Sequence, residues 1–153
     1  MVEETRAVAA LEALGVAHRV VTHGPVKSLA EAAAVRGIEP RDLVKTIVVR
    51  RGDDDYLFVL VPGDREFSWP KLRSLLGVSR LSMPDAATAL AVTGYERGTI
   101  TPFGSTHAWP VIADAAIVGR AISMGGGAHG VGVMLEADDV ISALDATVAD
   151  VTE

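Results

Sequence analysis

Residues 43–61 decide the fold of this chain: Leu43-Val-Lys-Thr-Ile-Val-Val-Arg-Arg-Gly-Asp-Asp-Asp-Tyr-Leu-Phe-Val-Leu-Val61. The β-branched and aromatic residues in it favour two strands, at 46–51 and 56–61. Gly52 to Asp55 between them have the composition of a solvent-exposed turn. The stretch therefore predicts a β-hairpin whose strands are mostly apolar.

Lys45 is unusual in this hairpin because it opens a strongly apolar strand. Burial of an ammonium group is costly unless the group is paired. Alternation along a strand places Lys45 on the same face as Ile47 and Val49. Two interpretations remain open. The ammonium group could lie at the rim of a pocket and contact a ligand there, or the apolar stem of Lys45 could pack against the protein while the ammonium group reaches water.

The rest of the chain alternates helical and extended patterns around this hairpin. Ser28 and Glu31 form a capping-box pattern that opens an alanine-rich helix ending at Gly37. Further helices are expected at 4–14, at 85–92, at 136–144 and from a cap at Asp64 or Ser68 to Leu76, with a helical turn at 40–44. Strands are expected at 19–22, 79–83, 111–113, 121–124, 131–135 and 147–151. Hairpin-like pairs dominate, which favours a mixed α+β fold over a doubly wound parallel sheet.

Length and composition indicate one compact domain covering residues 1–153. The chain is 49% hydrophobic and contains no cysteine, so a core can form without disulfides and thiol chemistry is excluded. The first residues lack the apolar stretch of a signal peptide, and no segment approaches the ~18 apolar residues of a membrane span. We therefore expect a cytoplasmic protein that does not insert into membranes.

Charge is distributed unevenly along the chain. The net charge is −6, which argues against a strong, general nucleic-acid binder. Residues 18–51, however, carry seven Lys or Arg against three Asp or Glu. This segment could face phosphate groups, although ordinary surface variation would also explain it.

Two glycine-containing loops could complete a binding site. The loop 94–104 combines glycines, which allow close backbone approach, with a stiffening proline. The loop 123–130, Ser-Met-Gly-Gly-Gly-Ala-His-Gly, could present backbone N–H groups to an oxyanion, a carboxylate or a phosphate. Neither matches a nucleotide-binding fingerprint. For the second loop alone, a glycine-rich hairpin turn is the simpler interpretation.

Other kinds of catalytic centre find little support in the sequence. The four histidines do not share metal-ligand spacing, so we expect no metal and no cofactor. No serine occupies a nucleophile elbow. His129 in the glycine loop is the strongest candidate among the histidines for substrate contact, and His23 could line the same pocket.

The lysine-bearing strand and the two loops together resemble the YbaK family of aminoacyl-tRNA deacylases, also called the prolyl-tRNA synthetase-associated domain. The resemblance extends over nearly the whole chain, from the capped helix at Ser28 through Lys45, Gly98–Pro102 and Asp114 to Ser123–Gly130. It implies a compact α+β domain with a mixed, partly barrel-like sheet flanked by helices. It also implies hydrolysis of amino acids wrongly attached to tRNA, commonly tRNA(Pro).

The same resemblance assigns roles to individual residues. The family lysine corresponds to Lys45, and the family's glycine–proline loop corresponds to Gly98–Pro102, with Thr99 where relatives have a second glycine. We expect Thr99 to alter the floor of the pocket. With neither a nucleophile nor a metal in view, Lys45 is better interpreted as an electrostatic anchor for the substrate than as a general base. The expected substrate-binding residues are His23, Thr46, Gly98, Thr99, Ile100, Thr101, Pro102, Ser123, Gly125, Gly126, Gly127 and His129.

Partners and rival functions follow from the same considerations. The isolated protein should bind aminoacyl-tRNA weakly, through residues 18–51. A synthetase or an elongation factor is a candidate partner that holds the tRNA. Tight, salt-insensitive binding of the isolated protein to RNA would contradict this expectation. The oligomeric state, monomer or homodimer, stays open. A non-catalytic module that binds an aminoacyl, aminoacyl-adenylate or tRNA ligand is one alternative, and a hydrolase of another aminoacyl ester or of a nucleotide is a second.

Overall fold

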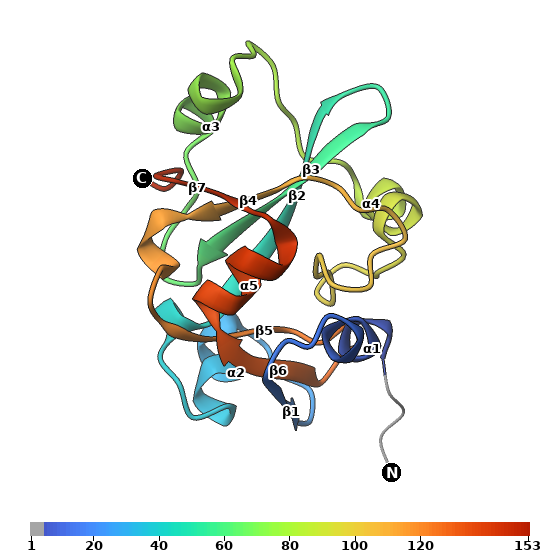
Figure 1. Ribbon diagram of the computed structural model, residues 1–153, viewed down its shortest axis with the longest axis vertical. Coiled ribbons are helices and arrows are strands. Elements are labelled where there is room, and N and C mark those ends of the chain that lie inside the picture. The colour runs from blue at the N-terminus through green and yellow to red at the C-terminus, as the bar shows by residue number, and fades with distance from the viewer. Residues whose placement is uncertain (1–4) are drawn as a thin grey trace.

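The computed structural model describes residues 5–153 as an α+β fold with two sheets (Figure 1). The helices are α1 (Arg6–Ala13), α2 (Leu29–Val35), α3 (Trp69–Leu76), α4 (Ala86–Thr93) and α5 (Ala137–Leu144), with 3-10 turns η1 (Pro40–Asp42) and η2 (Ala115–Ile117). The strands are β1 (His18–Thr22), β2 (Val44–Gly52), β3 (Asp55–Pro62), β4 (Val111–Asp114), β5 (Ala121–Gly125), β6 (Val131–Glu136) and β7 (Thr147–Ala149). The expected α+β class is confirmed.

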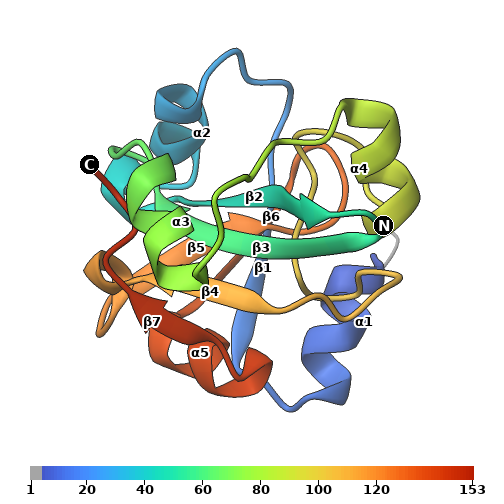
Figure 2. The same cartoon turned by 90° about the horizontal axis from the view of Figure 1, so that it is seen from above.

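The two sheets differ in topology and are joined by one backbone bridge. The first is antiparallel, in the order β1-β6-β5, and the second is mixed, in the order β2-β3-β4-β7. The predicted hairpin is the antiparallel pair β2–β3. A parallel bridge between Leu43 and Ser123 brings the start of β2 to β5, and the two sheets share one apolar core between them (Figure 2).

Three expected elements are shorter than the sequence pattern indicated. The strand expected at 79–83 is reduced to one bridge, in which Ser82 pairs with Arg50. The strand expected at 147–151 ends at Ala149, because the N–H of Val151 donates to a carboxylate instead of to a strand. The turn expected at 40–44 ends at Asp42, since β2 has begun by Val44.

Most of the helix caps predicted from the sequence are present in the structure. Ser28 Oγ accepts from the N–H of Glu31 at 3.1 Å, and Glu31 reaches back to the N–H of Lys27 at 3.2 Å. Ser68, not Asp64, caps α3 by accepting from the N–H of Lys71. These caps fix where α2 and α3 begin.

The β2–β3 hairpin separates two apolar clusters. Val44 and Val48 face the larger cluster, which also includes residues of α1 and α5. Val49 and Ile47 face a smaller cluster beneath α3. The alternation predicted for Lys45, Ile47 and Val49 is therefore confirmed for the two apolar members, and Thr46 belongs to the opposite face, between Val44 and Val48. Within residues 5–153, no helix has the length and apolarity that a membrane crossing requires.

Candidate functional site

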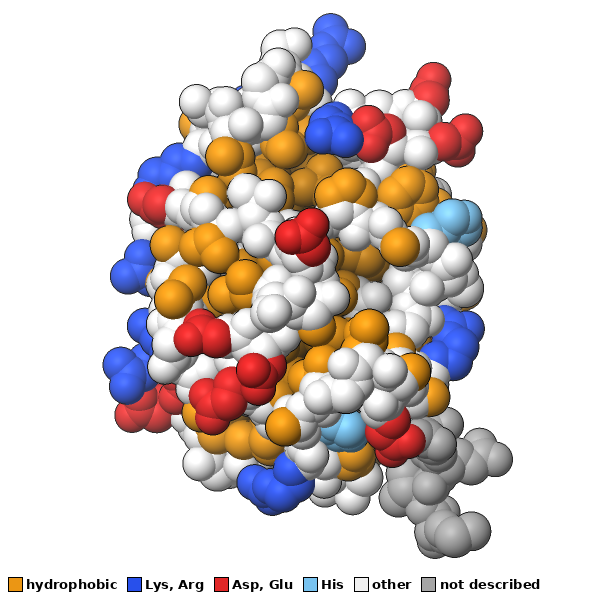
Figure 3. Space-filling view, viewed as in Figure 1, with side chains coloured by type: hydrophobic (Ala, Val, Ile, Leu, Met, Phe, Trp, Pro, Cys, Tyr) orange, Lys and Arg blue, Asp and Glu red, His pale blue; other side chains and the backbone are white. Residues whose placement is uncertain are grey.

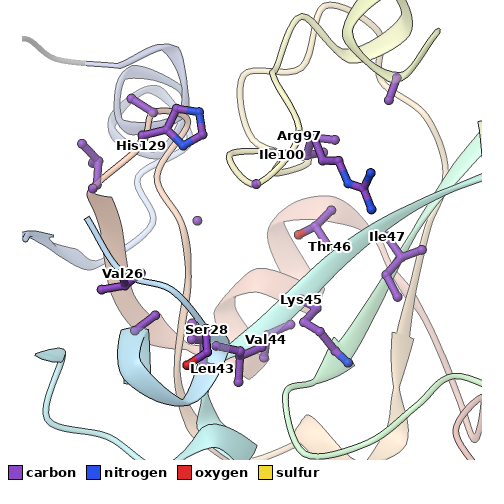
Figure 4. Close-up of a pocket in the computed structure, with 18 of the residues that line it drawn as sticks. Val26, Ser28, Leu43, Val44, Lys45, Thr46, Ile47, Arg97, Ile100 and His129 are labelled. Atoms are coloured by element: carbon purple, nitrogen blue, oxygen red, sulfur yellow. The ribbon is translucent and has the colours of Figure 1, made fainter. Parts of the chain in front are cut away.

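A cleft of about 1280 Å³ opens between α2, strand β2, the start of α4 and the two glycine loops (Figure 4). This volume exceeds the ~300–1,000 Å³ of pockets for drug-sized ligands. The predicted residues that line the cleft are His23, Lys45, Thr46, Gly98, Ile100, Gly125 and His129. Segments that are far apart in the sequence are thus brought to one concave surface.

The other predicted residues support the cleft without lining it. Thr99, Thr101, Pro102 and Ser123 are buried, and Gly126 and Gly127 lie in the turn between β5 and β6 without lining the cleft. The side chain of Thr99 faces into its own loop, where its hydroxyl donates to the carbonyl of Glu96 at 2.7 Å. Thr99 can therefore affect the floor of the pocket only through the backbone conformation of the loop 94–104.

The exposed edge of β2 is the main feature of the cleft. Arg50 exchanges two backbone hydrogen bonds with Ser82 on the side away from β3, at 2.7 and 3.1 Å. Because backbone groups alternate in direction along an antiparallel strand, those of Thr46 and Val48 also point away from β3. Both residues line the cleft. Between the bridges at Leu43 and Arg50, this edge therefore offers backbone donors and acceptors to a ligand.

Thr46 adds a side-chain group on the same strand. Among residues 5–153, its Oγ1 is the one buried side-chain oxygen or nitrogen without a hydrogen-bond partner. A buried polar group without a partner is rare and costly. Figure 4 shows Thr46 directed toward Ile100 and Arg97 across the cleft. The hydroxyl of this cleft residue thus has hydrogen-bonding capacity that no described protein group uses.

Lys45 lies at the rim of the cleft, partly buried along its stem. Its Nζ donates to the carbonyl of Arg65 at 2.9 Å, and Figure 4 shows the chain extending away from Thr46. An ammonium has three N–H donors, so the contact with Arg65 orients Lys45 and leaves donors for a ligand at the rim. Both sequence interpretations describe part of this geometry: the stem packs, and the charge borders a pocket.

The loop 94–104 is fixed by internal hydrogen bonds that aim Gly98 and Ile100 at the cleft. Tyr95 donates its hydroxyl to the carbonyl of Phe103 at 2.6 Å, and burial raises the pKa of Tyr95, so it stays protonated in this role. Gly98 has φ +90°, a conformation that favours glycine. The closest neighbour of a side chain added there would be His129, at 3.7 Å.

The second glycine loop is a hairpin turn between β5 and β6, which is the simpler of its two sequence interpretations. The N–H of Gly126 donates to the carbonyl of Val131 at 2.9 Å. That donor is therefore occupied and does not face an oxyanion, contrary to expectation. Of the four glycines in this loop, Gly125 and Gly130 line the cleft, and Gly126 and Gly127 do not. His129 contacts Glu96 at 3.3 Å in an exposed pair, which is worth little in stability.

Basic side chains at the cleft include two arginines that sequence reasoning did not single out. The charged side chains of the lining are Lys27, Arg36, Lys45, Arg97 and Asp85. On the face of the molecule drawn in Figure 3, acidic side chains are scattered across the surface and basic side chains lie mostly at the margins. The basic excess of residues 18–51 was the sequence signal for this, but it could not say which residues converge.

Comparison with known proteins identifies the family of the chain that carries this cleft. The model of the aminoacyl-tRNA editing domain matches residues 23–143, a range that includes β2, both loops and all of the predicted site residues. The chain belongs to the aminoacyl-tRNA editing domain family. The YbaK-type resemblance found in the sequence is thereby confirmed.

Curated relatives of this editing domain are proline–tRNA ligases. The ligase of Thermosipho melanesiensis is 34% identical over 100 residues, which are 65% of this chain and 17% of the ligase. That of Bacillus licheniformis is 31% identical over 105 residues, which are 68% of this chain and 18% of the ligase. The chain thus spans less than a fifth of the length of these relatives.

Solved structures agree with this placement along the whole fold. A protein provisionally described as a trans-editing enzyme for prolyl-tRNA synthetase superposes with a TM-score of 0.91 and 25% identity, over 100% of this chain and 99% of its own. The hypothetical protein APE2540 gives a TM-score of 0.89 and 25% identity, over 97% and 99%. Within residues 5–153 of the editing domain, no three His, Asp or Glu side chains form a group that could hold a metal ion.

Replacement of Thr46 by valine tests whether its hydroxyl is kept for a ligand. We expect Thr46→Val to leave the free energy of unfolding unchanged or to raise it by about 1 kcal/mol, because the lost hydroxyl has no partner to leave behind. Ester hydrolysis should fall several-fold, as for loss of one hydrogen bond. Urea unfolding and a deacylation assay measure the two effects.

A matched substitution separates this result from a general cost of removing threonine hydroxyls. Thr93 is also buried, but its hydroxyl donates to the carbonyl of Ala89 at 2.7 Å and accepts from the N–H of Tyr95 at 3.1 Å. Thr93→Val should therefore destabilise the fold. If Thr46→Val destabilises it equally, the hydroxyl is structural and our interpretation is wrong.

Proposed function

We propose that the chain is a trans-editing hydrolase that removes a small amino acid from mischarged tRNA, with tRNA(Pro) or a related tRNA as the carrier. The observation that carries the proposal is the free edge of β2 at the cleft, with the unpartnered Thr46 hydroxyl on it and the Lys45 ammonium at its rim. The family supports an editing role, and the proline–tRNA ligase relatives support the choice of tRNA.

The reaction requires little beyond positioning and charge stabilisation, because an aminoacyl ester is already reactive. Water attacks the ester carbonyl carbon, the bond from that carbon to the ribose oxygen breaks, and the ribose oxygen takes up a proton. Free amino acid and uncharged tRNA result. The protein has to hold the ester and stabilise the negative charge that develops on the carbonyl oxygen.

The described groups can divide these tasks. A correctly placed oxyanion donor contributes ~2.7–4 kcal/mol in known hydrolases. Backbone N–H groups of Thr46 or Val48 on the β2 edge are candidates for this donor, in place of the occupied N–H of Gly126. Lys45 anchors the substrate by charge-assisted hydrogen bonds, and Gly98 and Ile100 form the facing wall. Metal ions have no role in this scheme.

An editing hydrolase also answers a need that binding alone cannot meet. One methylene group distinguishes two substrates by only ~1–3 kcal/mol in an apolar pocket, so synthetases for small amino acids make errors. A second site that admits only smaller residues restores accuracy. Weak binding of tRNA by this acidic domain would leave a synthetase or an elongation factor to hold the tRNA.

A panel of mischarged tRNAs tests the proposal. We expect the protein, in buffer containing EDTA, to deacylate at least one small amino acid on tRNA(Pro) well above the spontaneous rate, and to leave prolyl-tRNA(Pro) intact. Lys45→Ala protein serves as the matched control. Binding of aminoacyl-tRNA without hydrolysis of any tRNA in the panel would establish the non-catalytic binding module. Hydrolysis of small aminoacyl esters or nucleotides, but of no aminoacyl-tRNA, would establish the alternative hydrolase.

A further inference from the structure

Arg36, at the carboxyl end of α2, is a cation in the cleft wall without an anionic partner. Its Nη1 donates to Ser123 Oγ at 2.9 Å and to the carbonyl of Met124 at 3.3 Å, and its Nε donates to His23 Nε2 at 3.4 Å. All three acceptors are neutral. Among residues 5–153, no carboxylate forms an ion pair with Arg36.

The tautomer of His23 follows from its other contact. Its Nδ1 lies 2.8 Å from the carbonyl oxygen of Gly24, and a carbonyl can only accept, so Nδ1 carries the proton. Nε2 is then an unprotonated acceptor that faces the guanidinium. His23 is thus a positioning residue for Arg36, which differs from the direct substrate contact expected from the sequence.

The guanidinium is held in place but not neutralised. Burial of Arg36 lowers its pKa, which reflects lost hydration that no protein anion replaces, although an arginine stays charged throughout the physiological range. Nη2 has only the shared His23 nitrogen nearby, at 3.4 Å, so at least one of its N–H groups remains for a ligand. A planar, fixed fork of this kind suits the oxygens of a phosphate.

Gly132 on β6 makes the space that the guanidinium occupies. A Cβ added at Gly132 would lie 2.5 Å from Arg36 Cζ, 2.7 Å from Nη1 and 2.9 Å from Nε. The φ angle of Gly132 is not positive, so its backbone does not require glycine. The absence of a side chain at this point of β6 is what allows Arg36 to lie across the strand and reach Ser123.

We propose that Arg36, positioned by His23, Ser123 and Gly132, binds the phosphodiester that joins the terminal adenosine of the substrate tRNA to the rest of the acceptor end. This inference rests on the proposed function and deepens it. The phosphate supplies the missing anion, and the ester then extends along the cleft toward the β2 edge. Arg36 thus holds the nucleic acid, while Lys45 and Thr46 remain for the ester.

Substrates with and without the phosphate separate this role from a structural one. We expect Arg36→Gln to raise KM for mischarged tRNA roughly ten- to a hundredfold, as for loss of a charge-assisted hydrogen bond. Hydrolysis of the corresponding aminoacyl-adenosine, which has no phosphate, should be unchanged. Addition of a 5′-phosphate to that small ester should restore the sensitivity to Arg36→Gln.

Two further variants guard against misfolding and general charge effects. Gly132→Ala should displace the guanidinium without removing its charge and should raise KM for tRNA. Thermal unfolding should show a loss of stability no larger than that of Arg36→Gln, because both variants leave the buried Ser123 hydroxyl without its donor. Arg73 lies on α3, outside the cleft. Arg73→Gln removes the same charge and should leave KM unchanged.

The outcomes distinguish the inference from the proposed function. If Arg36→Gln lowers hydrolysis of phosphate-free and phosphorylated substrates equally, Arg36 is not a phosphate ligand. The same conclusion follows if the substitution changes the hydrolysis of neither substrate. If the parent protein hydrolyses none of the esters, the proposed function fails, and titrations with adenosine 5′-monophosphate and adenosine then test Arg36 separately. A preference for the monophosphate that disappears in Arg36→Gln supports the inference, and its absence in the parent overturns it.

Discussion

Lys45→Ala should lower kcat/KM for deacylation of mischarged tRNA by about a hundredfold, the upper range for losing a charge-assisted hydrogen bond to the substrate. The ammonium lies at the cleft rim and has one protein partner, the carbonyl of Arg65. That carbonyl can turn to water when the lysine is removed. The free energy of unfolding should therefore change by no more than about 1 kcal/mol.

Two variants define what this result means. Lys45→Met keeps most of the apolar stem and removes only the charge, so it should be as inactive as the alanine variant. Lys71 pairs with Asp150 at 2.9 Å on the α3 side of the molecule and does not line the cleft; Lys71→Ala should retain activity. Full activity of Lys45→Ala would eliminate Lys45 as the substrate anchor and leave the β2 edge to act without it.

Asp114→Ala should be strongly destabilising and lower the free energy of unfolding by about 3 kcal/mol or more, because each buried donor left unpaired costs about 1–3 kcal/mol. Asp114 is 1% exposed at the end of β4. Its carboxylate accepts from the N–H of Val151 at 3.0 Å, from that of Ala116 at 3.2 Å and from the hydroxyl of Thr152 at 3.3 Å. Urea unfolding measures the loss.

The same variant separates stability from catalysis at a residue that belongs to the family resemblance. Asp114 does not line the cleft, so the folded fraction of Asp114→Ala should deacylate normally at low temperature. Asp114→Asn keeps one carbonyl acceptor and should lose less stability. An unfolding midpoint equal to that of the parent would show that Val151 and Thr152 do not depend on this carboxylate.

Much of the site could be predicted because its parts are local features. The apolar strand with Lys45, the cap at Ser28 and the two glycine loops each have a pattern within a few residues, and the resemblance joined them. The choice between the two roles of the loop 123–130 could not be made, because it depends on whether Gly126 finds a partner across the hairpin. That partner, Val131, is a matter of strand pairing.

Arg36 was missed for a related reason. In the sequence it is one basic residue near the end of a helix. Its acceptors, Ser123 and Met124, are more than 85 residues away, and the space it fills is created by Gly132 on another strand. A local pattern cannot reveal a contact whose other half lies that far along the chain.

The sequence by itself determined most of the helices and strands, the cap at Ser28, the apolar faces of β2 and the family, because each depends on side-chain chemistry over a few neighbouring residues or on the order of motifs. Only the tertiary structure decided which residues meet at the cleft. It left the edge of β2 unpaired between the bridges at Leu43 and Arg50, so that backbone groups of Thr46 and Val48 point away from β3 at the cleft, and it turned the Thr99 hydroxyl and the Gly126 N–H to partners within the protein. The reason is that strand pairing between distant segments, such as β1 with β6, satisfies some polar groups and leaves others free.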